Sequence, residues 1–155
     1  MARRMLNAGT LLLFFAIAVW AAADPIIGTW KLNLAKSNDN AAATFRSGTA
    51  KIEPREGGIN IAVDLVSAQG ERIHSEVTAK YDGSDYPVTG DPYSDTISIN
   101  RIDPNHVNTT WKKAGRVVTT AQNVVSSDGK TWTETIATKD AQGRDIIIVA
   151  VYDKQ

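Results

Sequence analysis

The fold is decided by residues 57–81, GGINIAVDLVSAQGERIHSEVTAKY. Two turn signals, Gly57-Gly58 and Gln69-Gly70, bound two segments in which apolar and polar side chains alternate. One face of the first segment carries Ile59, Ile61, Val63 and Leu65. Alternation with a period of two is typical of β-strands with one buried face, and glycine-containing turns are typical of hairpins. The stretch therefore predicts two antiparallel strands joined by a short turn.

The same rhythm continues to the end of the chain. Further turn signals recur at Asp82-Gly83, Gly90-Asp91-Pro92, Asp103-Pro104-Asn105, Ala114-Gly115, Ser127-Asp128-Gly129 and Gln142-Gly143. The segments between them are rich in Val, Ile, Thr, Tyr and Trp, which strands favour. The predicted strands are Gly28–Leu34, Thr49–Arg55, Ile59–Val66, Glu71–Tyr81, Thr96–Ile102, Val107–Lys113, Arg116–Ser126, Thr131–Lys139 and Arg144–Asp153. One more strand is expected if Tyr86–Thr89 also pairs.

A meander of this length must dispose of its two sheet edges. An open edge offers unpaired backbone groups, and closure into a barrel removes both edges. We therefore expect an all-β fold, an antiparallel up-and-down meander β-barrel of about 8–10 strands. In that barrel Ile146–Tyr152 would pair with Gly28–Leu34 and leave no free edge.

The last strand and one polar segment depart from the regular pattern. Ile146–Val151 is apolar at every position, which predicts burial on both faces or a cover on the outer face. Ala35–Ser47 is rich in Ala and Asn and is a candidate for that cover. It predicts a loop, or one short helix over Asn40–Phe45 with Asp39 or Asn40 as its cap.

Residues 1–23 have the pattern of a cleavable signal peptide. Arg3 and Arg4 precede the apolar run Leu11–Trp20, and Ala21-Ala22-Ala23 offers the small residues that a signal peptidase recognises. We expect residues 24–155 to form one lipocalin-like barrel domain, exported to the periplasm or secreted. The alternative is an uncleaved membrane anchor, but the apolar run is shorter than the roughly 20 residues that span a bilayer.

Charge and cysteine content exclude several classes of function. Without Arg3 and Arg4 the chain keeps 15 basic and 17 acidic residues, a formal charge of −2. No basic surface for nucleic acid and no polybasic segment for membranes is therefore expected. The chain contains no cysteine, so disulfides and thiolate metal sites are absent.

Two short motifs at the ends of residues 24–155 carry a family resemblance. They are Gly28-Thr29-Trp30-Lys31-Leu32 and Val151-Tyr152-Asp153-Lys154. The first resembles the Gly-x-Trp signature of lipocalins, and both together resemble the intracellular fatty-acid-binding proteins, which are also calycins. The whole chain is similar to small exported bacterial proteins described as lipocalin-like. The resemblance implies a barrel whose floor is formed by Gly28 and plugged by Trp30.

The sequence departs from fatty-acid-binding proteins in two respects. Those proteins have a pair of helices between the first two strands, for which Ala35–Ser47 is too short. They also often end in Arg-x-Tyr, whose side chains hold a fatty carboxylate. Here Tyr152 is kept but Ala150 stands in place of the arginine. The usual carboxylate clamp is therefore missing, which puts a fatty-acid ligand in doubt.

We expect non-enzymatic binding of a small apolar or amphipathic molecule in the barrel, with no cofactor and no metal. The candidate ligand-binding residues are Val63, Val77, Tyr81, Tyr86, Ile99, Trp111, Trp132 and Tyr152. Three tyrosines fall in residues 81–93, a stretch that could line the barrel mouth or could simply be a stiff connection.

Two alternative functions remain open at this stage. One is a module that binds another protein through loops such as residues 81–93. The other is an enzyme with a site scattered along the sequence, although no linear catalytic motif is present. Convergence of His74 and His106 with a carboxylate would favour a metal site.

Overall fold

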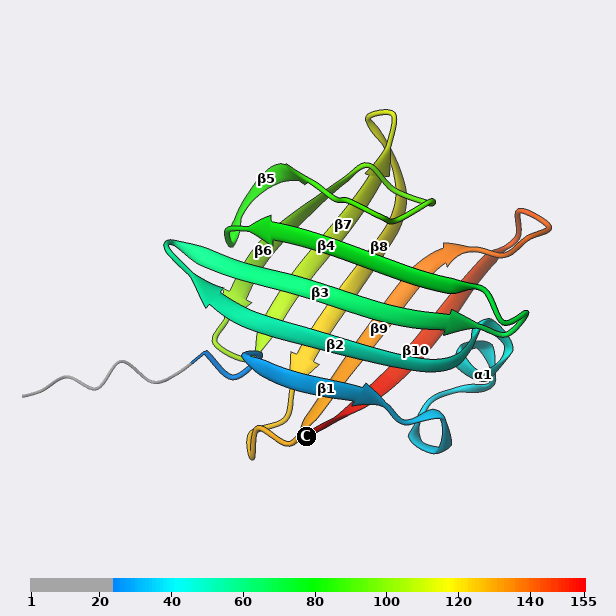
Figure 1. Ribbon diagram of the computed structural model, residues 1–155, viewed down its shortest axis with the longest axis horizontal. Helices are drawn as coiled ribbons and strands as arrows, with labels where there is room; N and C mark the ends of the chain where they lie inside the picture. Colours follow the sequence, from blue (N-terminus) through cyan, green and yellow to red (C-terminus); the bar gives the residue numbers. More distant parts are fainter. Residues whose placement is uncertain (1–23) are drawn as a thin grey trace, which may run out of the picture.

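The computed structural model describes residues 24–155, and the predicted signal peptide lies outside this range. The described residues form one antiparallel sheet with the strand order β4-β3-β2-β1-β10-β9-β8-β7-β6-β5 (Figure 1). Its strands are β1 (Gly28–Leu32), β2 (Phe45–Arg55), β3 (Gly58–Ser67), β4 (Arg72–Ala79), β5 (Asp82–Pro87), β6 (Thr96–Asp103), β7 (His106–Lys113), β8 (Arg116–Val125), β9 (Thr131–Lys139) and β10 (Asp145–Lys154). Strands that follow one another in sequence pair at every step except between β4 and β5, which confirms the all-β meander.

The first and last strands join, as expected for a barrel, but only Tyr152 of the predicted stretch Ile146–Tyr152 takes part in the strand pairing, because the short β1 pairs with the end of β10. β1 pairs with β10 through Trp30 opposite Lys154 and Leu32 opposite Tyr152. The predicted first strand is two residues too long, because a 3₁₀ turn, η1 (Leu34–Lys36), begins where we expected strand. The strand order and this register give the meander barrel that the resemblance to lipocalins and fatty-acid-binding proteins implies.

The expectation that no edge would be left free is wrong. No strand ladder joins β4 to β5, so the barrel has a seam there. A single bridge spans the seam, in which the backbone N–H of Glu76 donates to Thr89 O at 3.0 Å and that of Thr89 returns the bond at 2.9 Å. The predicted extra strand also lies earlier than expected: β5 ends at Pro87, and Thr89 serves as the bridge.

A contact of Gly90 explains how the bridge fits. A side-chain Cβ on Gly90 would lie 2.1 Å from His74 O on β4. The residue also has φ of +78°, a conformation that residues with a side chain rarely adopt. The chain can therefore approach β4 closely at this point because the residue is glycine.

The predicted short helix exists and follows a different cap residue. It is α1 (Asp39–Thr44), and its cap is Asn38 rather than Asp39 or Asn40. Asn38 Oδ1 accepts hydrogen bonds from the N–H groups of Ala41 and Val149, at 3.0 and 3.1 Å. Asn38 therefore caps the helix and also accepts a backbone hydrogen bond from β10, in the part of that strand with which β1 does not pair. The segment before β2 thus completes the edge of β10, whereas the prediction that the whole apolar run Ile146–Val151 is buried or covered is wrong at Ile147, which is 49 % exposed.

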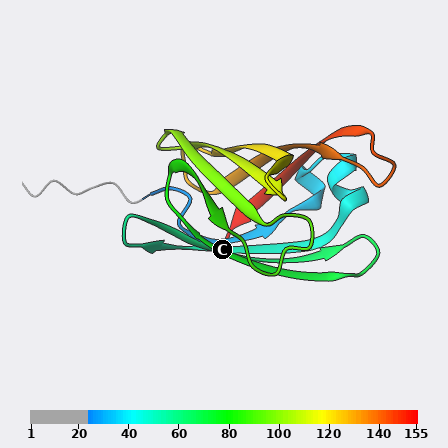
Figure 2. The same ribbon diagram turned by 90° about the horizontal axis from the view of Figure 1, so that it is seen from above.

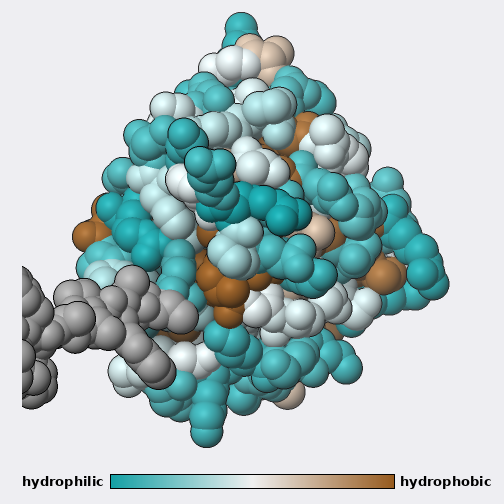
Figure 3. All heavy atoms as spheres, turned by 60° about the vertical axis from the view of Figure 1, so that its left-hand side comes forward, coloured by the Kyte–Doolittle hydropathy of each residue, from teal (hydrophilic) through white to brown (hydrophobic). Residues whose placement is uncertain are grey.

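The barrel is flattened into two layers, with β1–β4 in one layer and β6–β9 in the other (Figure 2). We call the end with the start of β1 the floor, and the end with α1 the mouth. Trp30 is fully buried near the floor, where its indole meets that of Trp132 edge to face with ring centroids 6.0 Å apart. Tyr152 stacks on Trp132 at 4.5 Å. The floor side brought forward in Figure 3 is mostly hydrophilic with small apolar patches, as expected for a closed end.

None of the helices within residues 24–155 has the length and apolar character needed to cross a membrane.

Candidate functional site

The most unusual residue inside the barrel is Glu134 in the middle of β9. Alternation along this strand directs Trp132, Glu134 and Ile136 inward. Glu134 is only 9 % exposed and is the one acidic side chain that is buried among residues 24–155. Its cross-strand neighbours are Ala150 on β10 and Asn123 on β8, so it stands at the level between floor and mouth.

The carboxylate of Glu134 has no partner within residues 24–155. Neither a hydrogen bond nor an ion pair joins it to another side chain or to the backbone of this part of the chain. Burial alone raises the pKa of Glu134 to about 7. Buried carboxylates are normally paired or hydrogen-bonded, because desolvation of an unpaired charge is costly. An unsatisfied acid in this position therefore indicates a partner from outside residues 24–155.

Neighbouring polar groups do not supply that partner, because they bond to one another. The indole N–H of Trp132 donates to Asn123 Oδ1 at 3.0 Å, and Asn123 Nδ2 donates to Thr109 Oγ1 at 2.9 Å. Asn123 and Thr109 are both buried. This chain of bonds fixes the orientation of the Trp132 ring and of the Asn123 amide, beside the free carboxylate.

Tyr152 is the second unsatisfied group. Its hydroxyl has no hydrogen-bond partner in residues 24–155, and burial, followed by the negative charge of Glu134, raises the pKa of this hydroxyl. Arg101 Nε is the only fully enclosed side-chain nitrogen or oxygen atom without a partner in the described part of the chain. The unbonded oxygens of Glu134 and Tyr152 are thus not fully enclosed, and each adjoins space that a water molecule can enter.

Between Glu134 and the mouth, several side chains of the inner wall are more exposed than those near the floor. Ile148 and Ala121, which flank Ile136 on β10 and β8, are buried, but other apolar side chains that line the mouth half are only partly buried. The partly buried ones are Phe45, Val63, Leu65, Ile73, Ile136 and Ile146. Towards the floor, by contrast, Trp30, Ile52 and Ile59 are buried. The structure therefore combines an accessible apolar mouth with a polar group deeper inside.

The partly buried basic groups are already engaged. Arg101 on β6 donates to Asp24 Oδ2, which also accepts the Tyr81 hydroxyl at 2.6 Å. The Arg101 guanidinium stacks over the Tyr81 ring, 3.7 Å from its centroid. Burial and the bond to Asp24 raise the pKa of Tyr81. This cluster ties the chain before β1 to the floor, so Tyr81 has a structural partner where we predicted a ligand contact.

The structure brings the predicted ligand-binding residues together around one core. Val77, Ile99, Trp132 and Tyr152 are buried members of it, and partly buried Val63, Tyr81, Tyr86 and Trp111 pack against it. The hydroxyl of Tyr86 is bonded to Asp82 at 2.8 Å. Gly28, at the start of β1, has φ of +144°, and the Lys154 side chain packs where a Cβ would stand.

The sequence reasoning missed Glu134, which has the strongest chemical character in the interior. The signal was available, since Glu134 is two residues from Trp132 and therefore on the same face of the strand. Asn123 and Thr109 also belong to this interior and were not among the predicted site residues.

The two histidines are not brought to a common site. His74 on β4 lies 2.7 Å from Asp64 and 3.2 Å from Glu76, and these bonds raise its pKa. His106 on β7 pairs with Asp103 at 2.6 Å. Within residues 24–155 no group of three or more His, Cys, Asp or Glu residues could hold a metal ion.

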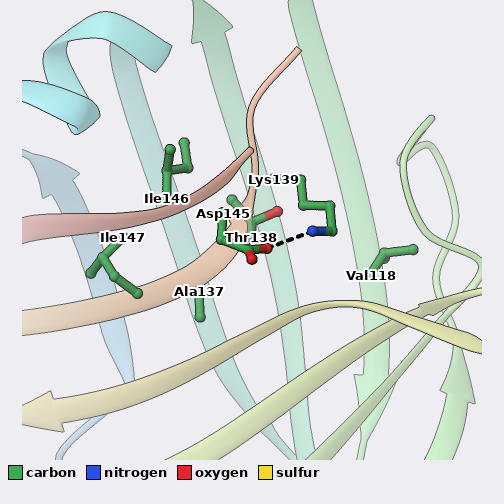
Figure 4. Close-up of a pocket in the computed structure, with 7 residues that line it drawn as sticks. All are labelled: Val118, Ala137, Thr138, Lys139, Asp145, Ile146 and Ile147. Carbon is green, nitrogen blue, oxygen red and sulfur yellow. Dashed lines mark hydrogen bonds and ion pairs between the residues drawn. The ribbon is translucent and has the colours of Figure 1, made fainter. Parts of the chain in front are cut away.

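Two grooves lie at the mouth end of the barrel, each lined by residues from both faces of the sheet. One has a volume of about 260 Å³ and runs across the mouth ends of β9 and β10 next to Val118 of β8 (Figure 4). Ile147 and Ile146 point to opposite sides of β10 there, and Lys139 Nζ pairs with Asp145 Oδ1 at 2.6 Å. The other groove, about 340 Å³, is lined by residues of β2, β3 and β4, among them outward Asp64 and His74 and inward Leu65 and Ile73.

Comparisons with known proteins find similarity only in structure. No protein-family model matches the sequence, and no curated protein matches it. A solved structure of zebrafish ileal bile acid-binding protein complexed with cholic acid is similar, with TM-score 0.49 and 12 % identity over 84 % of this chain and 99 % of that one. A redesigned β-barrel, mFAP1, bound to DFHBI has TM-score 0.44 and 15 % identity over 86 % and 98 %. At this level of similarity, the fold assignment depends on the strand order and register described above.

Proposed function

We propose that this protein binds a small apolar or amphipathic molecule inside its barrel, without chemical conversion of that molecule. The observation that carries the proposal is the unpartnered carboxylate of Glu134 below a half-buried apolar mouth. Ligand sites are typically apolar cavities with a few polar groups that orient the ligand. Burial of an apolar ligand would contribute about 25 cal/mol for each Å² removed from water, before the costs of association are subtracted.

Non-enzymatic binding fits the interior better than catalysis. General acid–base chemistry usually needs a second titratable group to exchange the proton, and nucleophilic catalysis needs an activated nucleophile. Among the described residues Glu134 has no second buried carboxylate or histidine beside it. Tyr152, its titratable neighbour, has a raised pKa, which disfavours the ionised form that could act as a base.

The proposal is tested by filling the mouth. Ile136→Trp adds bulk to a half-buried inward position of β9, two residues from Glu134, and Thr135→Trp adds the same bulk to the adjacent outward position. We expect Ile136→Trp to weaken binding of an apolar fluorophore by at least about tenfold, and Thr135→Trp to leave it unchanged. Equal binding by the two variants, with both folded by circular dichroism, would contradict an interior site. Native mass spectrometry of protein from its own host would then identify what the barrel carries.

A second candidate function is favoured by a separate observation on the outer wall. Val118 and Ile147 line the groove of Figure 4 and have 38 and 49 % of their surface exposed, and Val117, next to Val118 in the chain, is 57 % exposed. Contiguous apolar surface often marks contact with another protein. If the protein has such a partner, Val118→Ser with Ile147→Ser should abolish its co-purification and leave fluorophore binding unchanged. Loss of fluorophore binding in this variant would argue against two separate sites.

We also propose that the protein is exported and cleaved before Asp24. The residue pattern of 1–23 supports this, and cleavage there would keep Asp24 with its bonds to Tyr81 and Arg101. The test is the N-terminal sequence of protein from the periplasm or medium of its host. A mature chain that begins after Asp24, or retains Arg3 and Arg4, would contradict the proposal.

A further inference from the structure

We propose that the ligand is a cationic amphiphile, an apolar molecule with one ammonium group, and that Glu134 binds this group. The inference rests on the proposed interior site and names the chemical class of its ligand. It depends on the position of Glu134, on the absence of a donor for it in the described chain, and on the distribution of basic groups.

Glu134 lacks hydrogen-bond donors within the described chain. The two carboxylate oxygens of Glu134 accept no bond from residues 24–155, so a ligand that satisfies them must bring its own donors. An alkylammonium group brings up to three N–H donors and a full positive charge. Charge-assisted hydrogen bonds are roughly twice as strong as neutral ones. An alcohol offers one donor, and a carboxylate ligand offers none.

The interior has no free positive charge among residues 24–155. Arg101 and Lys112 are the only basic residues between 24 and 155 that are partly buried, and the others are exposed. Arg101 is held by Asp24, and Lys112 Nζ pairs with Asp85 at 2.8 Å. A ligand carboxylate would thus find no free counter-charge in the described interior and would meet the anion of Glu134. The interior is selective against acids and complementary to cations.

The carboxylate of Glu134 lies deeper in the barrel than the apolar side chains of the mouth. Glu134 lies between Trp132, which belongs to the aromatic cluster at the floor, and Ile136, which is partly exposed towards the mouth. A ligand that entered at the mouth would reach the carboxylate with its head group first. Its apolar body would then lie against the half-buried wall formed by side chains such as Ile136, Leu65 and Ile73. The hydroxyl oxygen of Tyr152 is a second acceptor for the same head group.

The pH dependence of binding follows from the groups that face Glu134. The adjoining strands present Asn123 and Thr109, which do not titrate, and Ala150 and Tyr152 of β10. Tyr152 is the only titratable neighbour, and it is neutral throughout the range of interest because its pKa is raised. Affinity for an ammonium ligand should therefore increase as the pH rises through about 7, where Glu134 ionises.

The experiment compares three ligands with the same apolar chain, namely decylammonium, 1-decanol and decanoate. Each is used below its micelle-forming concentration, and its affinity is measured at pH 8 by displacement of an apolar fluorophore. We expect decylammonium to bind at least about tenfold more tightly than decanoate. Glu134→Gln should reduce this ratio to near one, whereas Glu71→Gln, the same change at an exposed residue, should preserve it.

The outcomes separate the inference from the proposed function. Binding of all three ligands with equal affinity, tighter binding of decanoate, or an unchanged ratio in Glu134→Gln would overturn the cationic ligand class and leave interior binding intact. Binding of none would overturn interior binding and the ligand class with it. If Glu134→Gln does not fold, the unmodified protein still provides a test. The affinity for decylammonium relative to decanoate should be higher at pH 8 than at pH 6, and a ratio that does not increase with pH overturns the inference.

Discussion

The floor and the mouth of this barrel are built from the same alternating strands, yet they differ in how completely their side chains are satisfied. At the floor Trp30, Trp132 and Tyr152 form an aromatic cluster, and the indole N–H of Trp30 donates to Ile26 O at 2.7 Å. At the mouth several inward apolar side chains, such as Ile136 and Leu65, are only half-buried, and the edge of β10 is completed by Asn38 and Ser37 instead of a strand.

The floor therefore contributes mainly to stability, and the region between Glu134 and the mouth offers the surface that a ligand could use. A closely packed aromatic floor supplies packing energy, and the hydroxyl of Tyr152 is its one group that the proposed ligand could satisfy. The mouth leaves apolar surface partly in contact with water, and between the two ends Glu134 is buried without a partner. Both features cost stability in the free protein, and both would be relieved by a ligand. Four substitutions test this division.

The largest effect is expected at the floor. Trp30→Ala removes a side chain that is fully buried, and large-to-small changes of this kind cost about 3–5 kcal/mol of the free energy of unfolding. Urea denaturation monitored by circular dichroism measures this. Trp111→Ala, at a partly buried position, should cost less. Equal losses in the two variants would break the distinction between a packed floor and a looser interior.

The next largest effect is the pH dependence of the free energy of unfolding that Glu134, between floor and mouth, contributes. The ordinary pKa of a glutamate is 4.5, and burial raises that of Glu134 to about 7. Below pH 4.5 the carboxyl is protonated in the folded and the unfolded states, so it contributes no pH dependence. Between these two values only the folded state keeps the proton, and the free energy of unfolding therefore falls as the pH rises. Above pH 7 the loss is complete, at about 3 kcal/mol.

Glu134→Gln removes this titration. Relative to the unmodified protein, its free energy of unfolding should rise by about 3 kcal/mol between pH 4.5 and pH 8, as measured by urea denaturation at a series of pH values. Glu71→Gln is the matched control, and its difference from the unmodified protein should remain constant. A parallel pH profile for Glu134→Gln would show that the carboxylate is paired after all.

A smaller effect is expected at the seam between β4 and β5. Gly90→Ala would place a Cβ 2.1 Å from His74 O, whereas Gly83→Ala has the same left-handed backbone, with φ of +75°, and nothing within 4 Å. Both variants pay about 1–2 kcal/mol for the backbone conformation. Gly90→Ala should cost about 2 kcal/mol more than Gly83→Ala because the bridge to Glu76 must shift. Amide hydrogen exchange at Glu76 and Thr89 would reveal loss of the bridge, and equal protection in both variants would count against this account.

The smallest effect is expected at the mouth. Asn38→Ala removes the cap of α1 and the acceptor for Val149 N–H, and loss of a helix cap typically costs about 1 kcal/mol. Asn40→Ala removes only one exposed bond, to Ile147 O, and should cost less. Thermal unfolding of the two variants measures the difference. An Asn38→Ala loss as large as that of Trp30→Ala would mean that the mouth contributes to stability as much as the floor.

Some features of the site could be inferred from the sequence and others could not. The inward direction of Trp132 and Glu134 follows from alternation along one strand, so the acid could have been found. Its lack of a partner could not, because that depends on which groups β8 and β10 place beside it. Asn123 has the right chemistry for a partner, but its amide is already engaged by Trp132 and Thr109.

By itself, the sequence determined where the strands and turns fall, and with them the order of the meander, because turns and alternation are local properties of the chain. The contact between β1 and β10 joins the two ends of the described residues and needed the tertiary structure. Only the tertiary structure decided that the barrel keeps a seam between β4 and β5, that Asn38 completes the edge of β10, and that Glu134 remains unpaired. These features depend on contacts between residues far apart in sequence, whose fit is set by the packing of the whole barrel.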